Sequence, residues 1–167
     1  MSDQRPPFEI FRAADAPTLT DHGSMTYEDM TPVVVAGLQQ LSRSNEGGAL
    51  VSVPYCRPEM SLATLRVKSG YALPLHSHDC NCLYYVAQGS LTIGNETLHA
   101  GDGFYVGADV PYGYVAGPEG AIVLEFRAVD SFNVKFGLKT EQAWQNVSRK
   151  NEAARPNWAE EELPALT

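Results

Sequence analysis

The chain has 167 residues, of which 44% are hydrophobic and 19% are charged, and its formal net charge at pH 7 is -8. This length suffices for one domain with a sizeable core. The acidic balance argues against nucleic acid and anionic membranes as partners, because phosphate binding needs a basic patch.

The start of the chain has the composition expected of a cytoplasmic protein without a membrane partner. No apolar run approaches the roughly 20 residues that span a bilayer, and MSDQRPPFEI at positions 1–10 lacks the hydrophobic centre of a signal peptide. In the cytoplasm thiols stay reduced. The three cysteines are also few and odd in number, which does not favour a disulfide framework.

Residues 1–30 are polar and carry early prolines, and they predict an N-terminal arm. A barrel domain is expected over 31–138. It opens with TPVVVAGLQQL at 31–41, whose β-branched run predicts a strand. After a turn cluster, the apolar or alternating segments LVSVPYC at 50–56 and MSLATLRVK at 60–68 predict two further strands.

The middle of the chain alternates short strand-like segments with turns. SGYALP at 69–74 is a break, and four or five short strands are expected between 82 and 130. The turn signals between these strands are Gly89, Gly94-Asn95, Gly101-Asp102, Gly107 and Gly117-Pro118. Short strands at spacings of about 8–12 residues indicate an all-β sandwich or barrel.

The last segment, 139–167, is a C-terminal extension of different composition. It is charged, poor in β-branched residues and broken by Pro156. A short helix is expected at 140–153. The remainder either packs through Trp144 and Trp158 or stays mobile.

The stretch HSHDCNC at 76–82 holds two of the chain's four histidines and two of its three cysteines. Residues i and i+2 of a strand point to the same face, so His76 and His78 project together and can converge on one metal ion. A chance H-x-H pair is the competing interpretation. A disulfide between the two cysteines is disfavoured because so short a loop is strained.

Cys82 has the same strand parity as the histidines but lies too far along an extended chain. At about 3.3 Å per residue, His76 and Cys82 are roughly 20 Å apart, beyond the reach of one ion. Asp79 and Asn81 are turn formers. We therefore expect a hairpin that returns Cys82 to the histidines and leaves Cys80 at the loop tip.

Residues 70–116 resemble the cupin superfamily. The first cupin motif, a glycine followed by H-x-H, a glutamate and a second glycine, reads G-YALPL-HSH-DCN-C-LYYVAQ-G here, and the second reads G-DGFYV-GAD-VP-Y. The positions that match are Gly70, His76, His78, Gly89 and Gly101. Cys82 stands where the first motif has glutamate, and Tyr112 stands where the second has histidine.

The resemblance implies an all-β fold, a double-stranded β-helix or jelly-roll barrel, with one divalent metal held inside by three histidines and a glutamate. Carried over to this chain, the implied metal ligands are His76, His78, Cys82 and Tyr112. The thiol and the phenol bind metal less readily than the residues they replace, because each must lose a proton. The mixed ligand set favours Fe or Zn, with Ni, Mn and Cu as alternatives.

Three states of this site remain open. A metal is held by both histidines together with Cys82, Tyr112 or both, or it is held weakly by the histidines and water. In the third state no metal binds and the pocket has another use. A metal-free Tyr112 would be a catalytic acid or a hydrogen-bond donor.

Strand parity adds candidate substrate-binding residues. Tyr114 shares its parity with Tyr112, and Tyr84 shares its parity with Cys82. An aromatic-lined mouth suits a planar or apolar small molecule. The competing interpretation is that these tyrosines only pack the barrel.

Glu125 and Arg127 lie in AIVLEFRA, where they alternate with apolar residues. The alternation predicts an exposed pair, since the apolar residues would take the inner face. The alternative is an inward Glu125 that binds substrate or acts as an acid or base.

The sequence thus predicts a metal-dependent cupin enzyme that acts on a small organic molecule, of dioxygenase, lyase or isomerase type by resemblance. The alternative is a metal-free cupin that binds a small ligand without catalysis. Small cupins commonly pair through an added edge strand. The segment up to residue 41 is a candidate for that strand, so a homodimer is expected.

Overall fold

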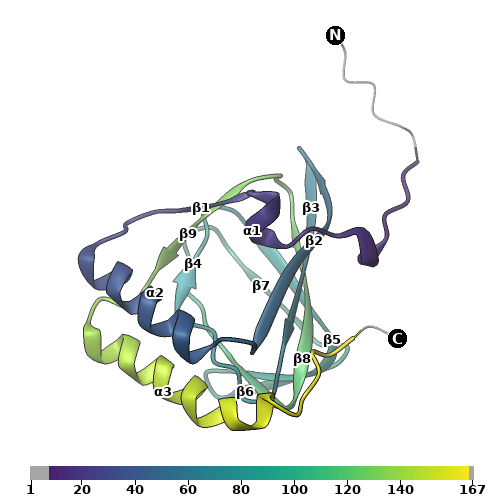
Figure 1. Ribbon diagram of the computed structural model, residues 1–167. Helices are drawn as coiled ribbons and strands as arrows, with labels where there is room; N and C mark the ends of the chain where they lie inside the picture. The colour runs from purple at the N-terminus through teal and green to yellow at the C-terminus, as the bar shows by residue number, and fades with distance from the viewer. Residues whose placement is uncertain (1–7, 166–167) are drawn as a thin grey trace.

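Within residues 8–165, which the computed structural model describes, the chain forms two β-sheets with two longer helices packed beside them (Figure 1). The strands are β1 (Met25–Tyr27), β2 (Ala49–Arg57), β3 (Met60–Val67), β4 (His76–Ser77), β5 (Cys82–Ile93), β6 (Glu96–His99), β7 (Gly103–Val106), β8 (Val115–Arg127) and β9 (Phe132–Phe136). The helices are the 3-10 turn η1 (Ala13–Asp15), α1 (Leu19–His22), α2 (Pro32–Ser44) and α3 (Glu141–Trp158). The first residues of the predicted arm lie outside the described part.

The larger sheet runs in the order β2-β3-β8-β5-β6, and β7 also pairs with β5. Its centre is the antiparallel pair β5 and β8, in which Tyr84 lies opposite Glu125. Because alternate residues of a strand face opposite sides of the sheet, every second residue of these strands enters the main core. These buried residues include Leu65, Val67, Tyr84, Val86, Ala121 and Val123.

The smaller sheet runs in the order β1-β9-β4. His76 of β4 lies opposite Phe136 of β9, and it also forms a bridge with Tyr112 in the loop before β8. In that bridge each backbone amide donates to the other residue's carbonyl, at 2.9 and 2.8 Å. The bridge links the smaller sheet to the loop before β8 of the larger sheet, and the arrangement is the all-β jelly-roll barrel that the resemblance implied.

The strand predicted at 31–41 is wrong, because this segment is the helix α2. Thr31 caps the helix by accepting a hydrogen bond from the Val34 amide, and Pro32 occupies the first turn, where a missing N–H costs little. Val34 and Leu41, seven positions apart, are buried against β9 and α3 residues. This packing outweighs the strand preference of the valine run.

The predicted turn signals are confirmed except for two that lie within strands. Gly89 is inside β5, and Gly117-Pro118 is inside β8. Gly89 has a φ of 72°, and a side chain there would overlap the backbone of Gly120. The register of β5 against β8 shifts next to Gly89. Glycine therefore permits a bulge that keeps two long strands paired instead of ending them.

The C-terminal helix is longer than the predicted span of 140–153. It continues through Pro156 to Trp158. Trp144 is buried in a second core cluster with α2 residues, and Trp158 is buried in the main core. The packing predicted for the two tryptophans is confirmed, and α2 and α3 lie side by side in Figure 1.

The predicted N-terminal arm takes part in the barrel. Met25–Tyr27 pairs in parallel with β9, and Thr18 forms a bridge with Ser52 of β2. These two segments of the predicted arm therefore pair with strands of the same chain. The domain limits at 30 and 138 stay a prediction. In the described part of the chain, no helix is both long enough and apolar enough to cross a membrane.

Candidate functional site

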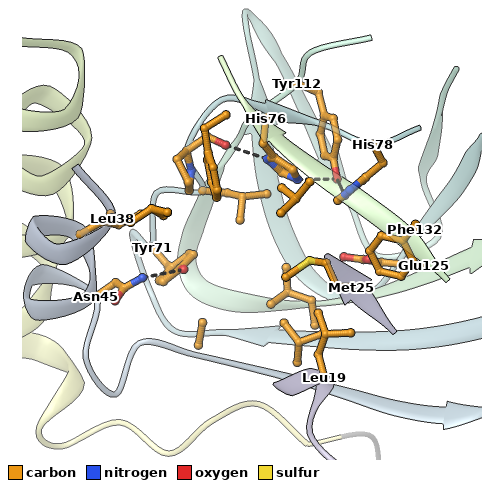
Figure 2. A pocket seen from close by; sticks show the side chains of 18 of the residues that line it. Leu19, Met25, Leu38, Asn45, Tyr71, His76, His78, Tyr112, Glu125 and Phe132 are labelled. Atoms are coloured by element: carbon orange, nitrogen blue, oxygen red, sulfur yellow. Dashed lines mark hydrogen bonds between the residues drawn. The ribbon is translucent and has the colours of Figure 1, made fainter. Parts of the chain in front are cut away.

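A cavity of about 240 Å³ lies inside the barrel, and Leu19 of α1 and Leu38 of α2 form part of its wall (Figure 2). Much of its wall is apolar and comes from helices and strands alike, including Leu19, Met25, Leu38, Val51, Leu65 and Phe136. Its polar groups are His76, His78, Tyr112, Glu125 and Arg127, with Asn45 and Tyr71 toward α2. The volume lies near the small end of ligand pockets, which run from about 300 Å³ upward.

Backbone carbonyls orient the two histidines of the cavity. His76 Nδ1 lies 2.8 Å from the Pro74 carbonyl oxygen, and His78 Nδ1 lies 2.6 Å from that of Asn133. A carbonyl oxygen only accepts hydrogen bonds, so both Nδ1 atoms carry the proton. Each Nε2 atom therefore presents a lone pair.

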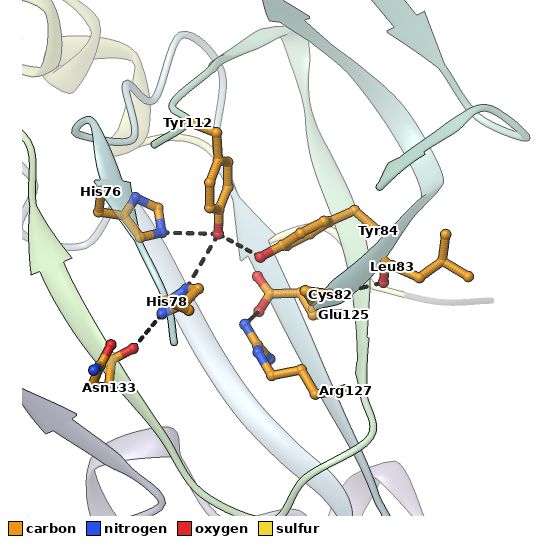
Figure 3. Close-up of polar contacts among 9 residues, drawn as sticks. All are labelled: His76, His78, Cys82, Leu83, Tyr84, Tyr112, Glu125, Arg127 and Asn133. Atoms are coloured by element: carbon orange, nitrogen blue, oxygen red, sulfur yellow. Dashed lines mark hydrogen bonds and ion pairs between the residues drawn. The ribbon is translucent and has the colours of Figure 1, made fainter. Parts of the chain in front are cut away.

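Both lone pairs point to the hydroxyl group of Tyr112, at which the dashed lines from His76, His78 and Tyr84 meet in Figure 3. This oxygen lies 2.9 Å from His76 Nε2, 3.3 Å from His78 Nε2 and 2.5 Å from the Tyr84 hydroxyl. The Tyr112 hydroxyl has one proton and can donate it to only one imidazole. The other Nε2 lacks a donor among the described residues.

Burial keeps the histidines neutral and the phenols protonated at pH 7. It lowers the pKa of His76 to about 4, with a further contribution from His78, and it also lowers the pKa of His78. Burial, and then the negative charge of Glu125, raises the pKa of Tyr84 and Tyr112 well above the ordinary value. The cluster is thus a set of uncharged donors and acceptors.

The hairpin predicted to return Cys82 to the histidines is wrong. His76 belongs to β4, which pairs with β9 in the smaller sheet, whereas Cys82 opens β5 in the larger sheet. The connection therefore crosses from one sheet to the other. Cys82 is buried in the main core, and this burial raises the pKa of its thiol to about 12. In the described residues, no three His, Cys, Asp or Glu side chains are grouped to hold a metal.

The segment between His78 and Cys82 is attached to its neighbours through the predicted turn formers. The Asp79 carboxylate accepts a hydrogen bond from the Asn133 amide at 2.9 Å, and the Asp79 amide donates to the Asn133 side chain at 3.1 Å. Asn81 accepts from the Ala108 amide at 3.0 Å. These contacts hold the loop against β9 and the end of β7, and they position the carbonyl that orients His78.

The exposed placement predicted for Glu125 and Arg127 is wrong. Both side chains are buried and line the cavity, and Arg127 Nη2 donates to Glu125 Oε2 at 2.5 Å. The outward residue of this strand segment is Phe126, which is 37% exposed. Apolar residues occupy both parities of AIVLEF, so alternation in the sequence did not identify the inner face.

The predicted inward direction of Tyr84 and Tyr114 agrees with their burial. Tyr84 stacks on Phe104 and contacts Tyr112. Tyr114 lies in the core, also against Phe104. Within the described part of the chain, neither of these two tyrosines lines the cavity. Their substrate-binding role stays a prediction.

The three cysteines are free thiols. Cys80 lies in the bend between β4 and β5, as predicted, and is partly buried. The sequence did not indicate that Arg127, residues of α2 and residues before position 30 line the cavity. Only the packing of distant segments brings these groups together.

Comparison with known proteins identifies structural neighbours. No family model matches the chain, and no curated protein matches it significantly. An RmlC-like cupin from Shewanella frigidimarina is 24% identical, with a TM-score of 0.45 over 50% of this chain and 78% of its own. The polyketide cyclase RemF from Streptomyces resistomycificus is 16% identical, with a TM-score of 0.54 over 64% of this chain and 83% of its own.

Proposed function

We propose that this chain, which has the cupin fold, is a metal-dependent enzyme that acts on a small organic molecule inside the barrel. One observation supports the proposal above all. Two imidazole Nε2 atoms, with tautomers set by backbone carbonyls, converge on the Tyr112 oxygen in the wall of the cavity. A histidine that binds a metal through one ring nitrogen usually donates the N–H of the other, here Nδ1–H, to a carbonyl or carboxylate oxygen.

The residues fit a metal in number and chemistry. His76 and His78 would supply two nitrogen ligands and Tyr112 an oxygen, and one Nε2 has no other donor among the described residues. Cys82 is a further candidate ligand, whose thiol would first have to lose its proton. Imidazole suits Fe and Zn, and also Ni or Cu. A divalent metal, when bound, would polarise a substrate oxygen or activate dioxygen, which is the chemistry of lyase, isomerase and dioxygenase reactions.

The residues of the chain itself would bind and orient the substrate. Arg127 holds one oxygen of the Glu125 carboxylate, which orients this group in the wall of the cavity. Glu125 would accept a hydrogen bond or a proton from the substrate. Tyr84, which is hydrogen-bonded to Tyr112, would hold a proton near the histidines, and the apolar wall would exclude water.

A metal-free binding protein is the second candidate function. The observation in its favour is that the Tyr112 hydroxyl already lies within hydrogen-bond distance of both imidazoles. In such a protein Tyr112 would donate a hydrogen bond to a ligand or act as an acid. The aromatic and aliphatic wall would still accept a small apolar molecule.

Metal analysis of protein purified without a His tag distinguishes the two functions. We expect roughly one transition-metal equivalent per chain, abolished by His76→Ala and unaffected by His99→Ala, since His99 is exposed. A loss of metal in Tyr112→Phe but not in Cys82→Ser would identify the phenol as the third ligand. Less than about one-tenth equivalent, with no thermal shift on adding Fe(II), Zn or Ni, would favour the metal-free protein.

We also propose that the chain forms a homodimer. Met25–Tyr27 of the predicted pairing segment pairs with β9 of the same chain, and the larger sheet offers a further candidate surface. An outer row of Tyr105, Leu83 and Phe126 crosses β7, β5 and β8 in register on the outward face of the larger sheet. These side chains are 64%, 54% and 37% exposed. A contiguous apolar patch of this kind is typical of a contact surface.

A further inference from the structure

Arg127 is more deeply buried than its hydrogen bonding would lead one to expect. The residue is 3% exposed, and the centroid of the Phe132 ring lies 4.1 Å from its Cζ atom. One nitrogen, Nη2, donates to Glu125. The other two, Nε and Nη1, have no nitrogen or oxygen hydrogen-bond partner among the described residues, and the Cys80 thiol, a weak acceptor, lies beside the guanidinium. A buried guanidinium with unused N–H groups is costly, because it has lost water without gaining an acceptor.

A second unused donor lies next to it. Ser61 of β3 is the register partner of Arg127 in β8. Its side chain is buried and inward-facing, since Ala63 and Leu65, which share its parity, are also buried. The Ser61 hydroxyl has no hydrogen-bond partner in the described residues either. Two adjacent strands thus carry unpaired donors, of which Arg127 lines the cavity and Ser61, its register partner, lies outside the lining residues.

We propose that Arg127 and Ser61 bind the carboxylate group of the small molecule that occupies the cavity. The planar guanidinium matches the two oxygen atoms of a carboxylate, and the serine hydroxyl supplies a further donor. Glu125 uses only Nη2, and a second carboxylate would be a far stronger acceptor for the remaining N–H groups than the nearby Cys80 thiol. The inference deepens the proposed function by naming a substrate class, an apolar monocarboxylate.

The remainder of the cavity supports this class. Arg127 and Glu125 compensate each other's charge, and the two histidines are neutral. The rest of the wall is largely aliphatic or aromatic and suits a hydrocarbon body. A ligand with one anionic end and an apolar body would therefore satisfy the unused donors without burying other polar groups.

Ser61→Ala separates a ligand-binding role from a structural one. The hydroxyl makes no hydrogen bond within the described part of the chain, so its removal should leave the Tm of the ligand-free protein equal or higher. The same substitution should weaken carboxylate binding about three- to tenfold. Ser52→Ala, on the neighbouring strand β2, is the matched control and should not change binding.

Arg127→Lys tests the guanidinium while keeping a positive charge beside Glu125. We expect it to weaken carboxylate binding at least about tenfold, because the lysine lacks the planar fork. Arg66→Lys, at a partly exposed position on β3, is the matched control. If Arg127→Lys does not fold, Ser61→Ala still decides the question.

The probes are benzoate and hexanoate, each compared with its amide, which has the same shape without the charge. Carboxylates at about 10 mM should raise the Tm by about 2 °C or more and the amides should not. Measurements on chelator-treated and on metal-supplemented protein keep this inference separate from the metal proposal. A shift without bound metal would support the carboxylate site alone.

Two results would overturn the inference. One is the absence of a carboxylate-specific shift in both forms of the protein. The other is a Tm that falls in Ser61→Ala while carboxylate binding is unchanged, which would mean that a buried water satisfies the serine and that no ligand does.

Discussion

The positions of two protons determine what His76 and His78 can do. Because Pro74 and Asn133 accept through their carbonyl groups, each imidazole keeps its proton on Nδ1 and offers Nε2 to the cavity. Burial disfavours a second proton on either ring. The histidines are therefore preorganised as neutral acceptors, which is also the form that binds metal.

The stability of the chelator-treated protein should depend on the protonation of His76. Its pKa falls from 6.5 in the unfolded chain to about 4 in the folded protein. Between these values the unfolded state binds more protons, so stability is full above about pH 6.5 and is lost as the pH falls. We expect the free energy of unfolding to decrease by about 2 kcal/mol from pH 7 to pH 5 on account of this residue.

Urea unfolding at pH 7, 6 and 5 measures this effect. His76→Gln keeps a neutral polar side chain that does not titrate, so its stability should change less over the same range. His22→Gln, at an exposed position, should behave like the unmodified protein. Equal pH dependence in His76→Gln and the unmodified protein would contradict the assignment.

At the scale of elements, the packing of α2 against α3 closes one side of the barrel. Gly37 of α2 lies directly against the Trp144 ring of α3, and a side chain at this position would overlap that ring. Leu38 and Leu41 of the same helix line the cavity. The contact between the two helices therefore sets the position of one cavity wall.

Gly37→Ala should destabilise the protein although alanine favours helices. The helix preference contributes about 1 kcal/mol in favour of alanine, whereas overpacking a core contact costs about 1–3 kcal/mol and more when a ring cannot move. We expect a net loss measured as a lower Tm. Gly107→Ala is the control, because a side chain there meets only ordinary contacts. An unchanged or higher Tm for Gly37→Ala would show that α2 and α3 can separate freely.

At the scale of the whole molecule, the outer row of Tyr105, Leu83 and Phe126 is where association is expected. Light scattering after size exclusion should give the mass of a dimer for the unmodified protein and of a monomer for Leu83→Lys, because burying an unpaired ammonium in an apolar contact is unfavourable. Val35→Lys, at an exposed position of α2, should stay dimeric. A monomeric unmodified protein would contradict the proposed homodimer.

The fold could be predicted to a considerable extent from local patterns. The strands at 50–56 and 60–68 were visible as apolar or alternating runs, and glycine spacing around H-x-H indicated the barrel. The strand predicted at 31–41 failed because capping and burial outweighed a β-branched run. Local preference is a weak signal wherever tertiary packing opposes it.

By itself the sequence indicated an all-β barrel through its strand pattern, and its H-x-H and glycine motifs implied the jelly-roll class by resemblance. It also paired His76 with His78, because strand parity depends only on neighbouring residues. The tertiary structure alone decided that Cys82 begins a strand of the other sheet and that Glu125 and Arg127 face inward. Inner and outer faces differ by a single residue step, and that choice depends on which distant strands pair. The unused donors of Arg127 and Ser61 became visible for the same reason, since an unpaired group can be recognised only after all its neighbours are in place.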